Sequence, residues 1–81
     1  MTQNYALVST GKPTMPFFYL KFVPGGFTST NGKSSVLPLS DLGGKIVERF
    51  SSKKECDRHI ASFCKNGKHP FEAMEQHYSA N

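Results

Sequence analysis

Four side chains that can bind a metal or act in nucleophilic catalysis gather near the end of the chain. They are Cys56, His59, Cys64 and His69, separated by two, four and four residues. Zinc knuckles have these gaps but order their ligands Cys, Cys, His, Cys, so the ligand types are permuted here. A knuckle also needs a compact loop with glycine between its ligands, whereas residues 60–63, IASF, suit a helix.

A continuous helix through this stretch excludes the metal site. Cys56 and Cys64 would then lie about 12 Å apart along the helix axis, which is too far for a shared zinc ion or a disulfide. We therefore expect reduced, partly buried thiols, no metal and no cofactor. A zinc- or thiol-dependent module is the alternative.

Cys56 and His59 are three residues apart, so on a helix they would lie on the same flank. A thiol beside a base is the arrangement that nucleophilic catalysis needs. The sequence supplies no glycine-rich loop for an oxyanion and no acidic residue at an obvious spacing, and a chain of this size has little room for a deep cleft. We therefore expect that the protein is not an enzyme and that Cys56 packs inward.

The stretch around these residues has the start, periodicity and stop signals of a helix. Ser52 and Glu55 have the spacing of a capping box, in which the carboxylate accepts from the backbone N–H of the cap residue itself. Asn66-Gly67 is a typical helix end. The pattern predicts a helix over residues 53–66. Its apolar stripe comprises Cys56, Ile60, Phe63 and Cys64.

A second, shorter helix is predicted over residues 70–78. Pro70 suits the first helical position. Phe71, Met74 and Tyr78 repeat at helical spacing, so they should form its buried face.

Strand signals precede the helices. Residues 4–9, 17–23 and 45–50 have β-strand composition, and Pro38 confines the short apolar run 36–39 to a sheet edge. Asn31-Gly32 predicts either a two-residue hairpin turn, with FTST and KSSV as its arms, or part of a mobile loop.

Alternation within the strands predicts which side chains share a face. In residues 17–23 we expect Phe18, Leu20 and Phe22 to face the core and Phe17 and Tyr19 to lie on the other face. In residues 45–50 we expect one face to carry Ile46 and Phe50 and the other to carry Val47 and Arg49.

Strands first and helices last predict one α+β domain over residues 1–81. It has an antiparallel sheet of three to five strands with both helices on one face. The opposite face would then leave Phe17 and Tyr19 uncovered, as an aromatic partner surface. A half-covered sheet also makes a homodimer one possible assembly.

Ten Lys and Arg against six Asp and Glu give a net charge of +4, which favours anionic partners. A single-stranded nucleic-acid-binding domain would use these charges on phosphates, with Phe17, Tyr19 or Phe27 stacking on bases. The alternative is an ordinary solvated helix face, diluted by Glu55 and Asp57. The basic residues expected at a partner or nucleic-acid surface are Lys33, Arg49, Lys54, Arg58 and Lys65.

A short strand runs directly into the helix in KIVERFSSKKECDRHI, residues 45–60, after a few antiparallel strands. In size and organisation the chain resembles small proteins encoded by bacteriophages and mobile elements, anti-CRISPR proteins among them. The resemblance carries over no functional residues. It implies a non-enzymatic inhibitor that docks on a host protein or nucleoprotein complex, such as a CRISPR surveillance complex.

No run approaches the roughly 18 apolar residues of a membrane span, and the first residues lack the pattern of a secretory signal. We therefore expect a cytoplasmic protein that makes no membrane contact, located in the host cytosol if it is phage-encoded.

Overall fold

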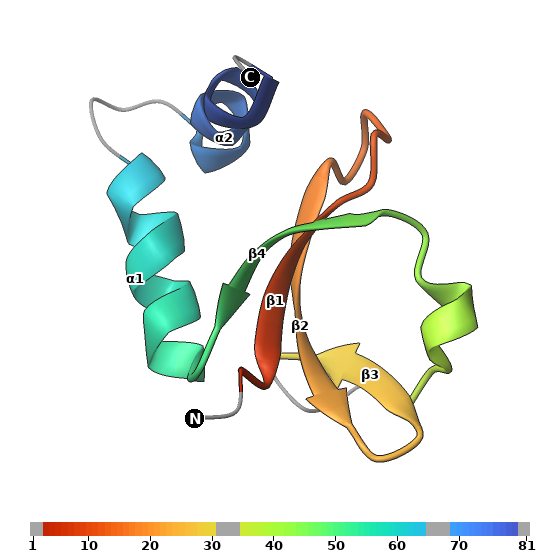
Figure 1. Ribbon diagram of the computed structural model, residues 1–81. Coiled ribbons are helices and arrows are strands. Elements are labelled where there is room, and N and C mark those ends of the chain that lie inside the picture. Colours follow the sequence, from red (N-terminus) through yellow and green to blue (C-terminus); the bar gives the residue numbers. More distant parts are fainter. Residues whose placement is uncertain (1–2, 31–34, 65–68, 80–81) are drawn as a thin grey trace.

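Strands followed by helices form an α+β architecture (Figure 1). The computed structural model describes residues 3–30, 35–64 and 69–79. Within them the strands β1 (Tyr5–Ser9), β2 (Phe17–Val23), β3 (Gly26–Ser29) and β4 (Lys45–Phe50) form a four-stranded antiparallel sheet in the order β3-β2-β1-β4. The helices α1 (Lys53–Phe63) and α2 (Pro70–Ser79) follow. The predicted fold class and order of elements are confirmed.

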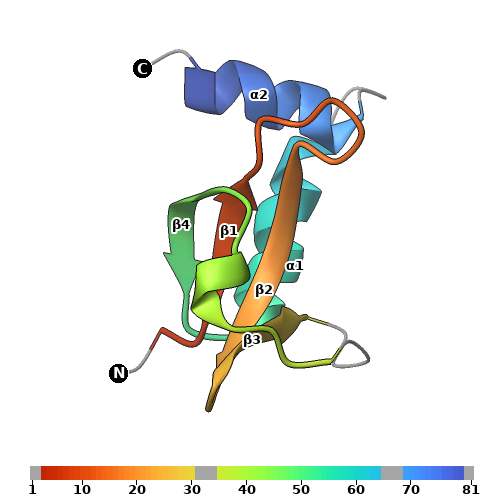
Figure 2. The same cartoon turned by 90° about the vertical axis from the view of Figure 1, so that its right-hand side faces the viewer.

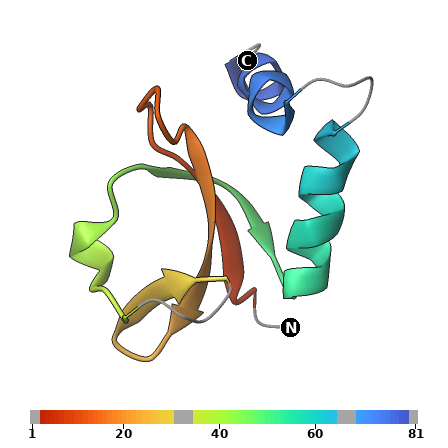
Figure 3. The same ribbon diagram turned by 180° about the vertical axis from the view of Figure 1, so that it is seen from behind.

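Both faces of the sheet are covered. The two helices lie on one side, where Leu7, Phe17 and Met74 form the centre of a buried cluster. On the other side lies the short 3-10 helix η1 (Leu39–Asp41), as two further views show (Figure 2 and Figure 3). A second buried cluster forms there, with Ala6, Val8, Leu20 and Phe27 at its centre.

The alternation along β2 is as predicted, but the prediction that Phe17 and Tyr19 form an uncovered aromatic face is wrong. Phe18, Leu20 and Phe22 pack in one cluster, and Phe17 and Tyr19 pack in the other. Phe17 is only 3% exposed, and its ring centroid lies 5.8 Å from that of Tyr78 on α2. The helices therefore cover the Phe17 face, while the chain returning from β3 to β4 covers the other.

The predicted faces of β4 are also wrong, because the pairing register shifts in the middle of the strand. Leu7 of β1 pairs with Glu48, whereas the next residue, Val8, pairs with Ile46. Val47 is therefore an extra residue, as in a β-bulge. Ile46 packs in the Leu20 cluster, whereas Val47 and Phe50 pack beneath the helices.

The connection from β2 to β3 depends on glycine. Pro24-Gly25 forms the turn, in which Gly25 has a φ of 94°, the left-handed value that a type II turn requires. A Cβ at the next residue, Gly26, would collide with the backbone carbonyl of Leu37. This close approach lets Phe27 and Leu37 exchange two backbone N–H···O=C hydrogen bonds of 2.8 Å each.

Asn31-Gly32 lies outside the described residues, so the structure does not decide between the predicted hairpin turn and the predicted mobile loop. A two-residue turn there would pair Phe27 with Val36, whereas the structure pairs Phe27 with Leu37. The run 36–39 contributes this single bridge before it enters η1. Pro38 explains why the run forms no longer strand, since it has no N–H to donate.

The start of α1 is as predicted, with one difference in the capping box. The Ser52 hydroxyl accepts from the Glu55 N–H at 3.3 Å. The Glu55 carboxylate, however, accepts from the N–H and hydroxyl of Ser51, each at 2.6 Å, and not from Ser52. The Ser51 hydroxyl is the main reason that the pKa of Glu55 lies below its ordinary value.

The end of α1 comes earlier than predicted. Phe63 is its last residue and Cys64 is the cap, while Asn66-Gly67 lies outside the described part of the chain. Cys64 is exposed, so the expected partial burial holds for Cys56 alone. The second helix begins at Pro70, and its predicted stripe is confirmed, with Met74 fully buried. No helix among the described residues is long and apolar enough to cross a membrane.

Candidate functional site

The predicted basic residues do not gather into one described surface. Lys54 and Arg58 are exposed one turn apart on α1. Arg49 lies on the other side of the sheet, with its guanidinium 5.6 Å from the Phe22 ring centroid in the Leu20 cluster. The remaining two, Lys33 and Lys65, fall outside the described residues.

The predicted aromatic pair has a structural role. Phe17 is buried beneath α2, as described above. Tyr19 packs against Phe50, and its hydroxyl oxygen lies 2.9 Å from Nδ1 of His59. Phe27, the third proposed stacking residue, is 6% exposed. Phe17 and Phe27 are thus buried, while the half-buried Tyr19 ring contacts Phe50 and His59.

His59 connects three elements through its two ring nitrogens. Tyr19 of β2 lies against Nδ1, and the hydroxyl oxygen of Tyr78 on α2 lies 3.1 Å from Nε2. One hydroxyl must donate to the unprotonated nitrogen, while the other accepts from the ring N–H. We call this arrangement the Tyr-His-Tyr bridge. Its rings are enclosed by Phe50 and Phe63, whose centroids lie 5.0 Å from that of His59.

The surroundings of the bridge keep all three members uncharged. Burial lowers the pKa of His59, and His77 acts in the same direction, while Glu48 partly opposes them. Burial also raises the pKa of Tyr19 well above its ordinary value and that of Tyr78 to about 12. Two neutral hydroxyls and a neutral imidazole can hold three elements together through hydrogen bonds without burying a charge.

The Cys56–His59 pair does not form an activated nucleophile. Burial, followed by the carboxylates of Asp57 and Glu55, raises the pKa of Cys56 to about 11, so the thiol stays protonated near neutral pH. Both nitrogens of His59 already lie at hydrogen-bond distance from tyrosine hydroxyls. Neither nitrogen is free to accept the thiol proton.

The four residues with metal-ligand spacing have separate roles. Cys56 is buried, and the exposed Cys64 thiol lies 3.3 Å from the Ile60 carbonyl oxygen. His59 belongs to the bridge, and Nδ1 of His69 accepts from the Phe71 N–H at the start of α2. Across residues 3–30, 35–64 and 69–79, no three His, Cys, Asp or Glu side chains are placed to hold a metal ion.

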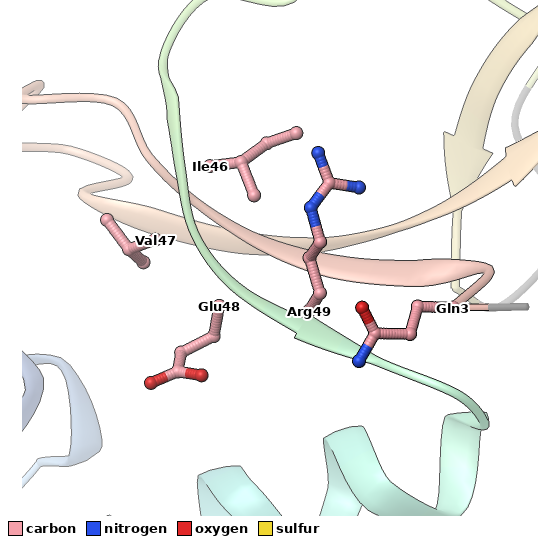
Figure 4. A pocket seen from close by; sticks show the side chains of 5 residues that line it. All are labelled: Gln3, Ile46, Val47, Glu48 and Arg49. Carbon is pink, nitrogen blue, oxygen red and sulfur yellow. The ribbon is translucent and has the colours of Figure 1, made fainter. Parts of the chain in front are cut away.

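A shallow cavity of about 380 Å³ follows the outer edge of β4 (Figure 4). Its lining side chains diverge, since Ile46 and Arg49 extend to one side of the strand and Glu48 to the other. This edge also carries the bulge at Val47. Charged side chains and a bulge are features that discourage edge pairing in natural sheets. The cavity therefore has no convergent set of groups for a ligand.

A second cavity, on the side of the sheet away from the helices, has a more uniform lining. It encloses about 270 Å³, and its apolar wall comprises Met15, Phe18, Phe27 and Leu37. The rest of the lining comes from Thr28, Ser29, Ser35, Asp41 and Gly43. We call this cavity the Leu37 hollow.

Exposed apolar side chains lie at and beside the Leu37 hollow. Met15 and Leu37 line it, and Val36 and Leu39 are near neighbours of Leu37 in the chain. These four are the large apolar residues counted as exposed among those described, with exposed fractions from 44% to 56%. We call the four side chains and the hollow together the Leu37 face.

The backbone of the Leu37 face is held in place by hydrogen bonds. The Thr10 hydroxyl donates to the Met15 carbonyl at 2.5 Å. Leu37 exchanges two bonds with Phe27, and Leu39 accepts from the Leu42 N–H at 3.1 Å in η1. The apolar side chains therefore lie on an ordered scaffold.

Sequence reasoning missed this face. The available signal was the run 36–39, which is apolar yet contains a proline that prevents a full strand. Apolar side chains on such a run need not enter a sheet core. Met15 offered no signal beyond an apolar residue in a turn-rich segment.

Comparison with known proteins adds no family to this description. No family model, curated protein or solved structure matches the chain.

Proposed function

We propose that this chain is a small, non-enzymatic binding protein that docks on a larger protein of its host through the Leu37 face. The observation that carries the proposal is the exposure of four large apolar side chains, of which Met15 and Leu37 line one hollow while Val36 and Leu39 lie within two residues of Leu37 in the chain. Contiguous exposed apolar surface on a small protein usually marks a contact with another molecule. An ordered backbone beneath it reduces the entropy lost on binding.

An inhibitor or adaptor role is part of this proposal, and the state of Cys56 and His59 supports it. The Cys56 thiol is protonated, and the nitrogens of His59 are engaged in the Tyr-His-Tyr bridge. The identity of the partner as a CRISPR surveillance complex stays a prediction from the resemblance in organisation.

The nucleic-acid alternative has less support. Its stacking residues, Phe17, Tyr19 and Phe27, are packed in the two clusters. Of its basic residues, only Lys54 and Arg58 share a described surface. The Leu37 hollow contains a carboxylate, which disfavours phosphate.

A pair of matched double variants tests the proposal. The partner is captured from host lysate with the intact chain, identified, purified and titrated calorimetrically. Met15→Ser with Leu39→Ser removes two apolar side chains that are more than half exposed, so the fold should persist. We expect the dissociation constant to rise at least about tenfold, which corresponds to about 1.4 kcal/mol of lost apolar burial.

The control is Lys54→Ser with Arg58→Ser, which changes the exposed side of α1. We expect this variant to bind within about twofold of the unaltered chain, since exposed charges contribute little. Loss of binding in the control alone would refute the proposal and favour the basic surface. Light scattering measures whether the chain forms a dimer. If it does, and if the Met15/Leu39 double variant is monomeric, then the occupant of the Leu37 face is a second copy of the chain.

A further inference from the structure

The polar part of the Leu37 hollow points to the chemistry of its occupant. Asp41 is the one charged residue among the described residues that line it. The side chain of Asp41 is exposed at the end of η1, whose backbone is fixed by the bond from the Asp41 N–H to the Pro38 carbonyl at 2.9 Å. An anionic group thus lies beside an apolar wall.

We propose that the Leu37 hollow receives a lysine or arginine side chain of the partner protein, with its alkyl stem along the apolar wall and its cationic head at Asp41. Lysine and arginine are the side chains that combine a long apolar stem with a positive tip. Met15, Phe27 and Leu37 contact the stem, and the carboxylate pairs with the head.

The hydroxyl groups of the hollow fit the same occupant. Ser29 and Ser35 line it together with Asp41, and hydroxyl oxygens can accept from guanidinium or ammonium N–H groups. A purely aliphatic occupant would give the carboxylate no charged partner. A phosphate or an acidic side chain would be repelled by Asp41.

This inference rests on the proposed function, because it assumes that the hollow is a docking site. Its test therefore uses two probes of similar shape, n-butylguanidinium and neutral n-butylurea. Each is titrated into the full ¹⁵N-labelled chain while amide shifts are recorded by NMR. We expect both probes to shift the amides of Phe27 and Leu37, with butylguanidinium binding about fivefold more tightly, as befits an exposed ion pair.

Asp41→Asn should remove this preference and leave butylurea binding unchanged. The matched control is Asp57→Asn, an exposed carboxylate on α1, which should keep the preference in full. About 0.5 M salt should weaken the preference in the unaltered chain by screening.

The outcomes separate the two proposals. Equal binding of both probes, or an unchanged preference in Asp41→Asn, would overturn the cationic occupant while leaving an apolar docking site. Absence of shifts at Phe27 and Leu37 with either probe would count against the hollow as a binding site and so against both proposals.

Discussion

Replacing Gly26 with alanine tests the contact that forms one wall of the Leu37 hollow. The new Cβ would collide with the backbone carbonyl of Leu37. In addition, Gly26 has a φ of 153°, a backbone conformation that residues other than glycine rarely adopt. The least costly relaxation moves the Leu37 segment away from β3. That movement breaks both hydrogen bonds between Phe27 and Leu37.

The expected loss of stability has two sources, the broken hydrogen bonds and the strained backbone at residue 26. Two backbone hydrogen bonds contribute about 1–3 kcal/mol together, and the unfavourable backbone conformation adds about 1–3 kcal/mol. We therefore expect Gly26→Ala to lower the free energy of unfolding by about 2–6 kcal/mol. Urea denaturation followed by circular dichroism measures this change.

Gly43→Ala is the matched control, because a Cβ at Gly43 would meet no atom within 4 Å. Its unfolding free energy should stay within about 0.5 kcal/mol of the unaltered chain. Hydrogen exchange gives a local readout. In Gly26→Ala, the Phe27 and Leu37 amides should lose their protection from exchange, while the amides that pair β1 with β2 should remain protected. If the two alanine variants were equally stable, the close backbone approach would not be a structural requirement and the reasoning would be refuted.

Two further predictions concern the helix side of the sheet. His59 has a lowered pKa in the folded protein, so the unfolded chain takes up a proton first as the pH falls below 6.5. The unfolding free energy should therefore fall as the pH is lowered through the ordinary histidine pKa of 6.5, and His59→Gln should flatten this slope in urea titrations. An equal slope in both proteins would exclude His59 as its source. Met74→Ala should lower the unfolding free energy by about 2–5 kcal/mol, because Met74 is fully buried between α2 and the sheet. Glu72→Ala, an exposed change on the same helix, should stay within about 0.5 kcal/mol, and comparable losses in the two variants would show that α2 does not depend on Met74.

Local signals in the sequence were sufficient to predict most elements. The β2 and β4 strands have the predicted bounds, because dense β-branched and aromatic residues are flanked by Pro and Gly. The start of α1 follows from Ser52 and Glu55, and that of α2 from Pro70. Each of these signals acts within a few residues of the chain.

The errors concern relations between distant segments. Whether Phe17 lies exposed depends on where α2 packs, and nothing within β2 specifies that. The extra residue at Val47 is visible only in its pairing with β1, where one residue is skipped. The contact between Gly26 and Leu37 likewise joins segments that have no local signature for each other.

The bulge at Val47 and the position of α2 together determine which apolar side chains remain exposed. By turning Val47 and Phe50 toward the helices, the bulge extends the apolar surface beneath α1 and α2. That surface then takes up Phe17 and Tyr19, which alternation alone would leave for a partner. The apolar residues that remain exposed lie on the opposite side, beside a carboxylate in a chain with a net charge of +4. The two proposals therefore combine opposite signs: the net charge of +4 favours an acidic partner at long range, whereas the occupant proposed for the Leu37 hollow is a basic side chain on that partner.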